Sequence, residues 1–338
     1  MKNTLSFVSA AALALSLTAC SSSGSTAATS TADGAKEVNI GVTIYQFNDN
    51  FMTLYRQDIQ SYFDELNESQ SDVHYNISIV DGNNDMATQT EQVNTFIAQG
   101  VDAMIVNLVQ TSSGETIADL CEDAGIPVVF INREMADYEY PADQCYVGAD
   151  ARDSGTYQGQ IIYDQENHGD LNGNGKVDYI MIMGDPENSD AQFRTEYSIK
   201  YLTDNGVEVN CLYQQTGNWD QAQGQEIAAA AISQYGSEID VIFCNNDAMA
   251  LGAAQAISAA GLTVGKDIYL VGVDALSECV EMVSNGTMTG TVLNDDAGQA
   301  TACCETVIGL LNGTAPADVV NYVPYVMVTS ENAADYMN

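Results

Sequence analysis

Apolar and polar positions alternate in a regular way along this chain. From Val38 onward, short apolar runs of strand length are each followed by a longer segment whose apolar residues recur with helical spacing. In the segment 49–68, six apolar side chains share one helical face: Phe51, Tyr55, Ile59, Tyr62, Phe63 and Leu66. An alternation of strand and helix predicts parallel sheets that are covered by helices on both faces.

The alternation occurs as two series. The first series contains the runs VNIGVTIY, YNISIV, AMIVNLV and IPVVFI, and the second contains YIMIM, VEVNCLY, IDVIFC, IYLVGV and TGTVL. Two such series predict two similar α/β lobes. In open parallel sheets, ligands bind outside the carboxyl ends of the strands. The residues that directly follow each run are therefore the candidates for a binding site.

Asn and Asp dominate these positions. The segments that follow the runs include QFNDNF, NLV, GDPENSDAQFR, NNDAM, DAL and NDD. Helix N-capping, which Asn and Asp perform, explains part of this pattern. It does not explain the doubled Asn of NND, the aromatic Phe51 beside Asp49, or Trp219, the only tryptophan. Carboxylates, carboxamides and flat aromatic faces together favour a sugar, whose hydroxyls donate and accept hydrogen bonds and whose C–H faces pack on rings.

The amino-terminal segment predicts secretion. Lys2 precedes an apolar stretch, residues 5–17, that is too short to span a membrane as a mature helix, so residues 1–19 are interpreted as a signal peptide. The ending LTAC resembles the lipobox of bacterial lipoproteins, which implies that Cys20 is lipidated and anchors an extracytoplasmic protein to the membrane. Residues 20–35 are small and polar, as is typical of a flexible tether.

The charge excludes several classes of partner. The chain has 9 Lys and Arg against 47 Asp and Glu, a formal net charge of −38. Binding to nucleic acid or to anionic lipid normally relies on clustered Lys and Arg, so we expect no nucleic-acid partner. With only two histidines and no CxxC motif, a zinc site and a dense disulfide framework are both disfavoured.

The stretch 170–182, DLNGNGKVDYIMI, begins like a calcium-binding loop. Gly175 stands at the sixth position, where an EF-hand loop turns sharply, but the twelfth position is Met181 instead of Glu. Oxygen-bearing side chains occupy positions 1, 3, 5 and 9: Asp170, Asn172, Asn174 and Asp178. The residues alone leave two interpretations open, namely an Asn/Gly-rich turn or a calcium site that a distant carboxylate completes.

Over essentially the whole mature chain, the motifs resemble one family. IGVTIYQFNDNFM, NLV, YVGAD, NNDAMALGA, GVDAL, GTVLND and VPYV occur in the order found in bacterial galactose/glucose-binding proteins. These are the solute receptors of sugar ABC importers, within the periplasmic-binding-protein superfamily. The resemblance implies a two-lobe α/β fold of type I, with a parallel sheet flanked by helices in each lobe and three hinge crossings. It places residues 36–126 and 294–322 in the N-terminal lobe and residues 127–293 and 323–338 in the C-terminal lobe, with Pro127 and Pro324 near crossings.

The resemblance also implies a sugar site. Phe51 and Trp219 would sandwich the sugar ring. Asn188 stands where the family usually has His, which puts the preference between galactose and glucose in doubt. Hydrogen bonds to the sugar would come from Asp49, Asn107, Asp190, Arg194, Asn246, Asp274 and Asn294.

Family members carry a calcium loop that a distant Glu completes, and this chain has Asp240 at that position. The resemblance therefore implies that calcium is a cofactor, with Lys176 contributing its backbone carbonyl. The implied ligands are Asp170, Asn172, Asn174, Lys176, Asp178 and Asp240.

The function implied is capture of galactose or glucose by a monomeric receptor and delivery to the membrane permease of an ABC importer. A sensor that presents the sugar to a chemoreceptor or receptor kinase, and a receptor for another monosaccharide, stay open as alternatives. A transcription factor of related fold would begin with a helix-turn-helix instead of a secretion signal. A glycosidase that uses Asp49 and Asp190 is disfavoured because the site lacks Glu and because Arg194 should keep Asp190 ionised.

Overall fold

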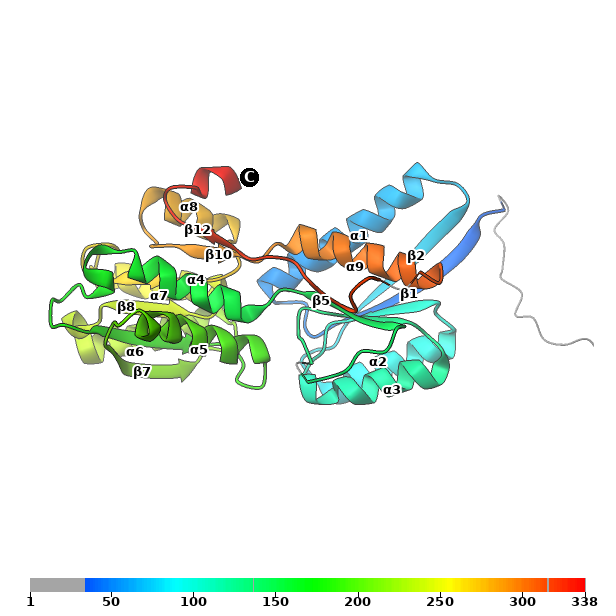
Figure 1. Cartoon of the computed structure of the whole chain (residues 1–338), viewed down its shortest axis with the longest axis horizontal. Helices are drawn as coiled ribbons and strands as arrows, with labels where there is room; N and C mark the ends of the chain where they lie inside the picture. The colour runs from blue at the N-terminus through cyan, green and yellow to red at the C-terminus, as the bar shows by residue number, and fades with distance from the viewer. Residues whose placement is uncertain (1–33, 136, 315, 338) are drawn as a thin grey trace, which may run out of the picture.

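Two α/β lobes lie side by side and are joined by crossing segments (Figure 1). This computed structural model describes residues 34–135, 137–314 and 316–337. The predicted signal peptide and Cys20 lie outside the described residues. The two-lobe α/β fold with parallel, helix-flanked sheets is confirmed.

The first lobe is built on a six-stranded parallel sheet in the order β11-β5-β4-β3-β1-β2. The strands are β1 (Lys36–Ile44), β2 (Val73–Asp81), β3 (Ala103–Val106), β4 (Val128–Ile131), β5 (Gln144–Gly148) and β11 (Val320–Tyr322). The helices are α1 (Asn50–Ser69), α2 (Met86–Gln99), α3 (Gly114–Ala124) and α9 (Asp296–Leu311). Strands buried on both faces read as continuous apolar runs, which is why the sequence shows them clearly.

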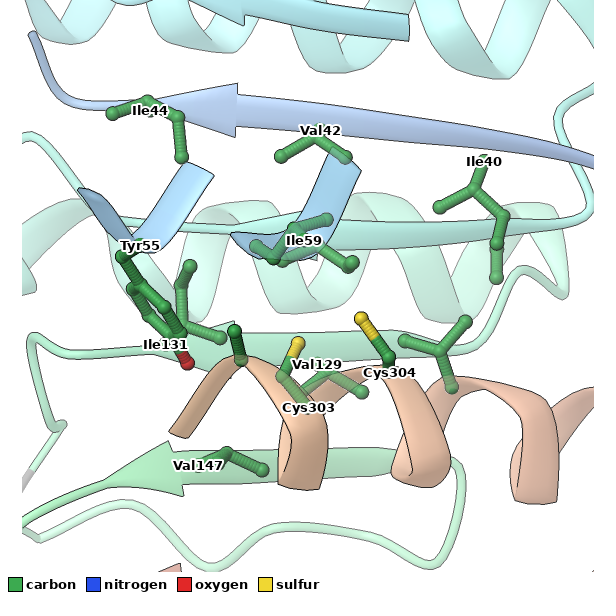
Figure 2. Packing of buried hydrophobic residues seen from close by; sticks show 14 of the residues in the cluster. Ile40, Val42, Ile44, Tyr55, Ile59, Val129, Ile131, Val147, Cys303 and Cys304 are labelled. Carbon is green, nitrogen blue, oxygen red and sulfur yellow. The ribbon is translucent and has the colours of Figure 1, made fainter. Parts of the chain in front are cut away.

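Two helix layers cover this sheet. Tyr55 of α1 and the adjacent Cys303 and Cys304 of α9 pack over the sheet residues Val42 and Val129, all of them buried (Figure 2). Side chains of α2 and α3 pack with the opposite faces of the strands in a second cluster. Helices from the beginning and the end of the chain therefore share one core.

The second lobe contains a four-stranded parallel sheet in the order β7-β6-β8-β9. A short antiparallel pair, β10 and β12, lies next to it through isolated bridges from β9 and the turn that follows. The strands are β6 (Val177–Met183), β7 (Val209–Thr216), β8 (Val241–Cys244), β9 (Tyr269–Val271), β10 (Thr291–Leu293) and β12 (Val326–Val328). The helices are α4 (Ala151–Tyr163), α5 (Ser189–Asp204), α6 (Gln221–Tyr235), α7 (Asp247–Ala259) and α8 (Ser277–Asn285).

Short 3₁₀ turns complete the described elements. They are η1 (Thr111–Ser113), η2 (Glu166–Gly169), η3 (Gly236–Glu238) and η4 (Ala333–Tyr336). Within the described residues, no helix has both the length and the apolar character needed to cross a bilayer.

The first crossing differs from the position expected from sequence. Strands β4 and β5 pair in the first sheet, and Pro127 accepts a hydrogen bond from Met104 of that sheet, so residues 127–148 belong to the first lobe. The crossing falls between β5 and α4 instead of at Ile126. No helix separates β4 from β5, so the alternation of strand and helix gave no sign of the additional strand. The other crossings run from β10 to α9 and from β11 to β12, which includes Pro324.

Candidate functional site

A cavity lies between the two lobes, at the carboxyl ends of both sheets. The empty space in this cavity, including the solvent at its mouth, is about 330 Å³. Every residue expected to contact sugar lines this cavity except Asn107. The complete wall comprises Tyr45, Asp49, Phe51, Met52, Asn132 and Arg133 of the first lobe, Asn188, Asp190, Arg194, Trp219, Asn246 and Asp274 of the second, and Asn294 at a crossing.

Asn107 lies behind the wall instead of in it. Its side-chain oxygen accepts a hydrogen bond from the Tyr45 backbone N–H at 3.1 Å, and its amide donates to the Ile131 carbonyl and to the Asn132 side chain. The side chain is completely buried. In this arrangement Asn107 holds the ends of three neighbouring strands together and positions Tyr45 and Asn132.

Asp49 and Phe51 reach the cavity from the start of α1. Asp49 caps this helix, because one carboxylate oxygen accepts the Met52 backbone N–H at 2.7 Å. The other oxygen accepts the Tyr45 hydroxyl at 2.6 Å. These two bonds fix the carboxylate in place and leave lone pairs for a ligand.

Arg194 is the buried cation of the second lobe. Its guanidinium donates to the Asn245 carbonyl at 2.9 Å, to the Tyr325 hydroxyl at 2.9 Å and to Asp190 at 3.3 Å. Its Nε is buried and has no partner among the described residues. Burial opposes the charge, but Tyr325, Asp190 and Asp274 together raise the pKa of Arg194. A fixed cation with a spare donor suits a ligand oxygen.

Burial raises the pKa of Asp190 to about 6, although Arg194 and Arg133 act in the opposite direction. Arg194 lowers the pKa of Asp190, as expected from the sequence, but burial has the larger effect and the net shift is upward. The sequence shows a cation four residues away, whereas the fold adds the removal of water.

Asp274 and Asn294 form the floor near a crossing. Asn294 donates from its amide to Asp274 at 3.3 Å, and Gln299 donates to the Asn294 side-chain oxygen at 2.6 Å. Burial raises the pKa of Asp274 well above its usual range, against the effect of Arg194. Asp274 also has a φ of 120°, a conformation that residues other than glycine rarely adopt. Strain of this kind is concentrated at ligand sites.

Trp219, Asn246 and Asn188 complete the wall of the second lobe. Trp219 has a positive φ of 66°, and its ring lies against Gly184. Asn246 caps α7 through the Met249 backbone N–H at 3.0 Å. Asn188 caps α5 and accepts the Asp190 backbone N–H at 2.9 Å. Asn246 and Asn188 therefore each cap a helix and also line the cavity.

Sequence reasoning missed Asn132 and Arg133. Both follow β4 directly, at the carboxyl end of a strand, so the rule that selected the other residues also selects them. Arg133 is 2% exposed, stacks over the Tyr45 ring at 3.7 Å and donates to the Val109 carbonyl.

The lobes are not bonded to each other across the cavity. Within the described residues, every hydrogen bond or ion pair that joins the lobes lies at the crossings. A ligand in the cavity would supply polar contacts between the lobes.

The calcium-like loop lies at the opposite end of the second sheet, beside the start of β6. Asp170 accepts the backbone N–H groups of Gly173, Asn174 and Gly175, a compact loop closed by its own first residue. The expected distant ligand, Asp240, is fully buried. Its oxygens accept the backbone N–H groups of Leu171, Asn172 and Asp178.

Lys176 also affects this loop. Its ammonium group pairs with Asp178 at 2.8 Å. The described residues include no group of three or more His, Cys, Asp or Glu side chains placed to hold a metal. In this arrangement Lys176 and backbone N–H groups already engage the carboxylates of Asp178 and Asp240, so the loop would have to rearrange to hold a calcium ion.

Comparison with known proteins agrees with this geometry. The periplasmic binding protein domain matches residues 40–315. The chain is 34% identical over 322 residues, 90% of this chain and 93% of the relative, to the D-galactose/methyl-galactoside binding periplasmic protein MglB of Haemophilus influenzae. It is 33% identical over 315 residues, 93% of this chain and 97% of the relative, to a putative rhizopine-binding protein of Rhizobium meliloti.

A solved structure shows the same fold with a ligand. An ABC transporter solute binding protein from Bacillus halodurans, with bound myo-inositol, superposes with a TM-score of 0.77 at 27% identity. The match covers 91% of this chain and 99% of that chain. This chain therefore belongs to the periplasmic binding protein family, as an extracytoplasmic, non-catalytic receptor of the sugar ABC importers.

Proposed function

We propose that this receptor captures a monosaccharide, with D-galactose and D-glucose as the first candidates, and delivers it to the permease of an ABC importer. The observation that carries the proposal is the composition of one cavity wall, in which both lobes contribute carboxylates or carboxamides and an aromatic ring. Sugar hydroxyls use both acceptors and donors, and the wall offers both.

The two halves of the wall have complementary roles. Asp49 and Phe51 belong to the first lobe, while Asp190, Arg194 and Trp219 belong to the second. A sugar held between them contacts both lobes and stabilises the closed arrangement by its greater affinity for that arrangement. The permease would then distinguish loaded from empty receptor by the relative position of the lobes.

Asn188 is the residue on which the choice of sugar depends. Its side-chain oxygen already accepts the Asp190 backbone N–H, so its amide group is the part left to face a ligand. It is neutral and shorter than the His expected from the family resemblance. A hydroxylated ring other than galactose, including a cyclitol, is the second candidate, because one relative is named for rhizopine and a similar structure holds myo-inositol.

Calorimetric titration of the chain from residue 34 onward tests the proposal, with galactose, glucose, ribose, xylose and myo-inositol as ligands. We expect micromolar or tighter binding of at least one hexose or cyclitol. Trp219→Ala should weaken that binding about 100-fold, because it removes one face of the stacking pair. The matched control is Phe193→Ala, which removes an aromatic ring that stacks on Arg152 outside the cavity wall. Unchanged affinity in Trp219→Ala would contradict the assigned site.

The role after binding needs a separate test. Loss of labelled-sugar uptake after deletion of the gene would support delivery to a permease, whereas normal uptake with lost chemotaxis or signalling would support a sensor. We also propose membrane anchoring through a lipid on Cys20, with the receptor acting as a monomer. Cys20→Ala should release the protein from membranes. Elution of the chain from residue 34 onward as a dimer in size-exclusion chromatography would contradict the proposal that the receptor is a monomer.

A further inference from the structure

A second cavity adjoins the sugar cavity and is larger. Its empty space, including open solvent at its mouth, is about 940 Å³, and it shares three wall residues with the sugar cavity: Tyr45, Arg133 and Trp219. Both lobes contribute to it, so it continues the space between them outward from the sugar cavity. We refer to this second cavity as the vestibule.

Carboxamides dominate the vestibule wall. Only some are engaged in bonds within the protein, since Gln46 donates to the Tyr45 hydroxyl and Asn218 donates to Gln223. The carboxamide residues of the wall are Gln46, Asn48, Asn84, Gln110, Asn218 and Gln223. Each carboxamide offers a donor and an acceptor, the combination that a hydroxyl group requires. Asp185 and Asp220 outnumber the single cation of the wall, Arg133, so an anionic occupant is disfavoured.

Two buried donors lie on the residues shared by both cavities. Arg133 Nε and Trp219 Nε1 are inaccessible to water and have no hydrogen-bond partner among the described residues. Arg133 is also 2% exposed as a whole. A buried donor without a partner destabilises a protein by about 1–3 kcal/mol. Both donors belong to residues that line the two cavities, so a ligand that extends from one cavity into the other would lie beside these residues.

We propose that the vestibule binds a second hydroxylated unit, so that the receptor takes a neutral glycoside whose first ring occupies the sugar cavity and whose second ring occupies the vestibule. This inference rests on the proposed sugar-binding function. The glycosidic and adjacent hydroxyl oxygens would lie near Arg133 and Trp219, and the carboxamides would contact the second ring. Tyr45, whose ring stacks on Arg133, lines both cavities.

Calorimetry with sugars of increasing size tests this inference. The probes are galactose and glucose, their methyl α- and β-glycosides, and the disaccharides lactose, melibiose, maltose and cellobiose. We expect at least one disaccharide to bind within tenfold of its parent monosaccharide. Gln223→Trp, which fills the vestibule from α6, should weaken that disaccharide at least tenfold and change the monosaccharide less than twofold. Gln225→Trp is the matched control, because Gln225 lies on the same helix, is exposed and lines neither cavity.

The outcomes separate this inference from the function on which it rests. Binding of monosaccharides with a more than tenfold weaker affinity for every disaccharide would overturn the vestibule as a subsite and leave the proposed function intact, whether or not the methyl glycosides bind. An equal effect of Gln223→Trp on monosaccharide and disaccharide would also overturn it. No binding of any probe would refute the proposed function itself.

Discussion

Gly184→Ala offers a sharp test of the stacking role of Trp219. Gly184 directly follows β6, and the indole ring of Trp219 occupies the space where a side chain at this position would lie. A Cβ atom at Gly184 would lie 2.3 Å from the ring, whereas ordinary contact begins at 3.4 Å. The ring must therefore move by about 1 Å. The φ of Gly184 is not in the left-handed region, so alanine adds no backbone strain at this position.

A displaced ring can no longer lie flat against the sugar face that it is proposed to cover. Loss of aromatic stacking removes about 0.5–1.5 kcal/mol, so we expect affinity to fall about 2- to 12-fold. Trp219 is the only tryptophan, so intrinsic fluorescence reports both the position of the ring and the arrival of ligand.

The assay is a fluorescence titration with whichever sugar the wild-type protein binds most tightly. Gly309→Ala is the matched control, since its added Cβ would meet only the Thr314 carbonyl, at 3.2 Å, far from the cavity. We expect a shifted emission maximum and weaker binding for Gly184→Ala alone. A shifted emission with wild-type affinity would refute the stacking role, and unchanged emission would refute the packing argument.

Three further predictions concern single side chains. Asn188→His should change the ratio of galactose to glucose affinity at least fivefold by calorimetry, whereas an equal change for both sugars would show that this position does not select. Because burial raises the folded-state pKa of Asp190 to about 6, above its unfolded value, folding takes up a proton, and the melting temperature of the ligand-free protein should rise as pH falls from 7 toward 5. Asp190→Asn should make the melting temperature less dependent on pH. An equally steep pH profile in that variant would show that another group causes the dependence. Asp240→Ala should lower the free energy of unfolding by about 3 kcal/mol, because it leaves three backbone N–H groups without a hydrogen-bond acceptor. A calcium chelator should change the wild-type melting temperature by less than about 1 °C, because Lys176 already pairs with Asp178. A calcium-dependent rise of several degrees would show that the loop rearranges and binds the metal.

Much of the fold could be predicted because buried parallel strands read as unbroken apolar runs. The strands that escaped prediction lack that signal. β5 follows β4 without a helix between them, and β11 is a partly exposed three-residue strand at the sheet edge. Sequence reasoning therefore placed the first crossing at Ile126, before β4 and β5, whereas the chain crosses after β5.

The position of the site followed from one topological rule, and its details did not. Strand ends gave Asp49, Asn107 and Asn246 equal standing as candidates, but the rule does not say which side chains turn toward the cavity. Asn107 turns inward to the backbone, where it meets Ile131 and Asn132. Burial likewise depends on the assembled lobes, which is why the raised pKa of Asp190 could not be read from its neighbours in sequence.

The order of the three crossings also affects how the chain can fold. The core of the first lobe needs α9, whose Cys303 and Cys304 pack against Tyr55, and its sheet ends with β11. The second lobe needs β12, which pairs with β10. A chain that emerges amino-terminus first therefore completes neither lobe until its last segments appear. For a receptor that works outside the cytoplasm, this arrangement delays final folding until nearly the whole polypeptide is available, and truncation near the carboxyl end should unfold both lobes together.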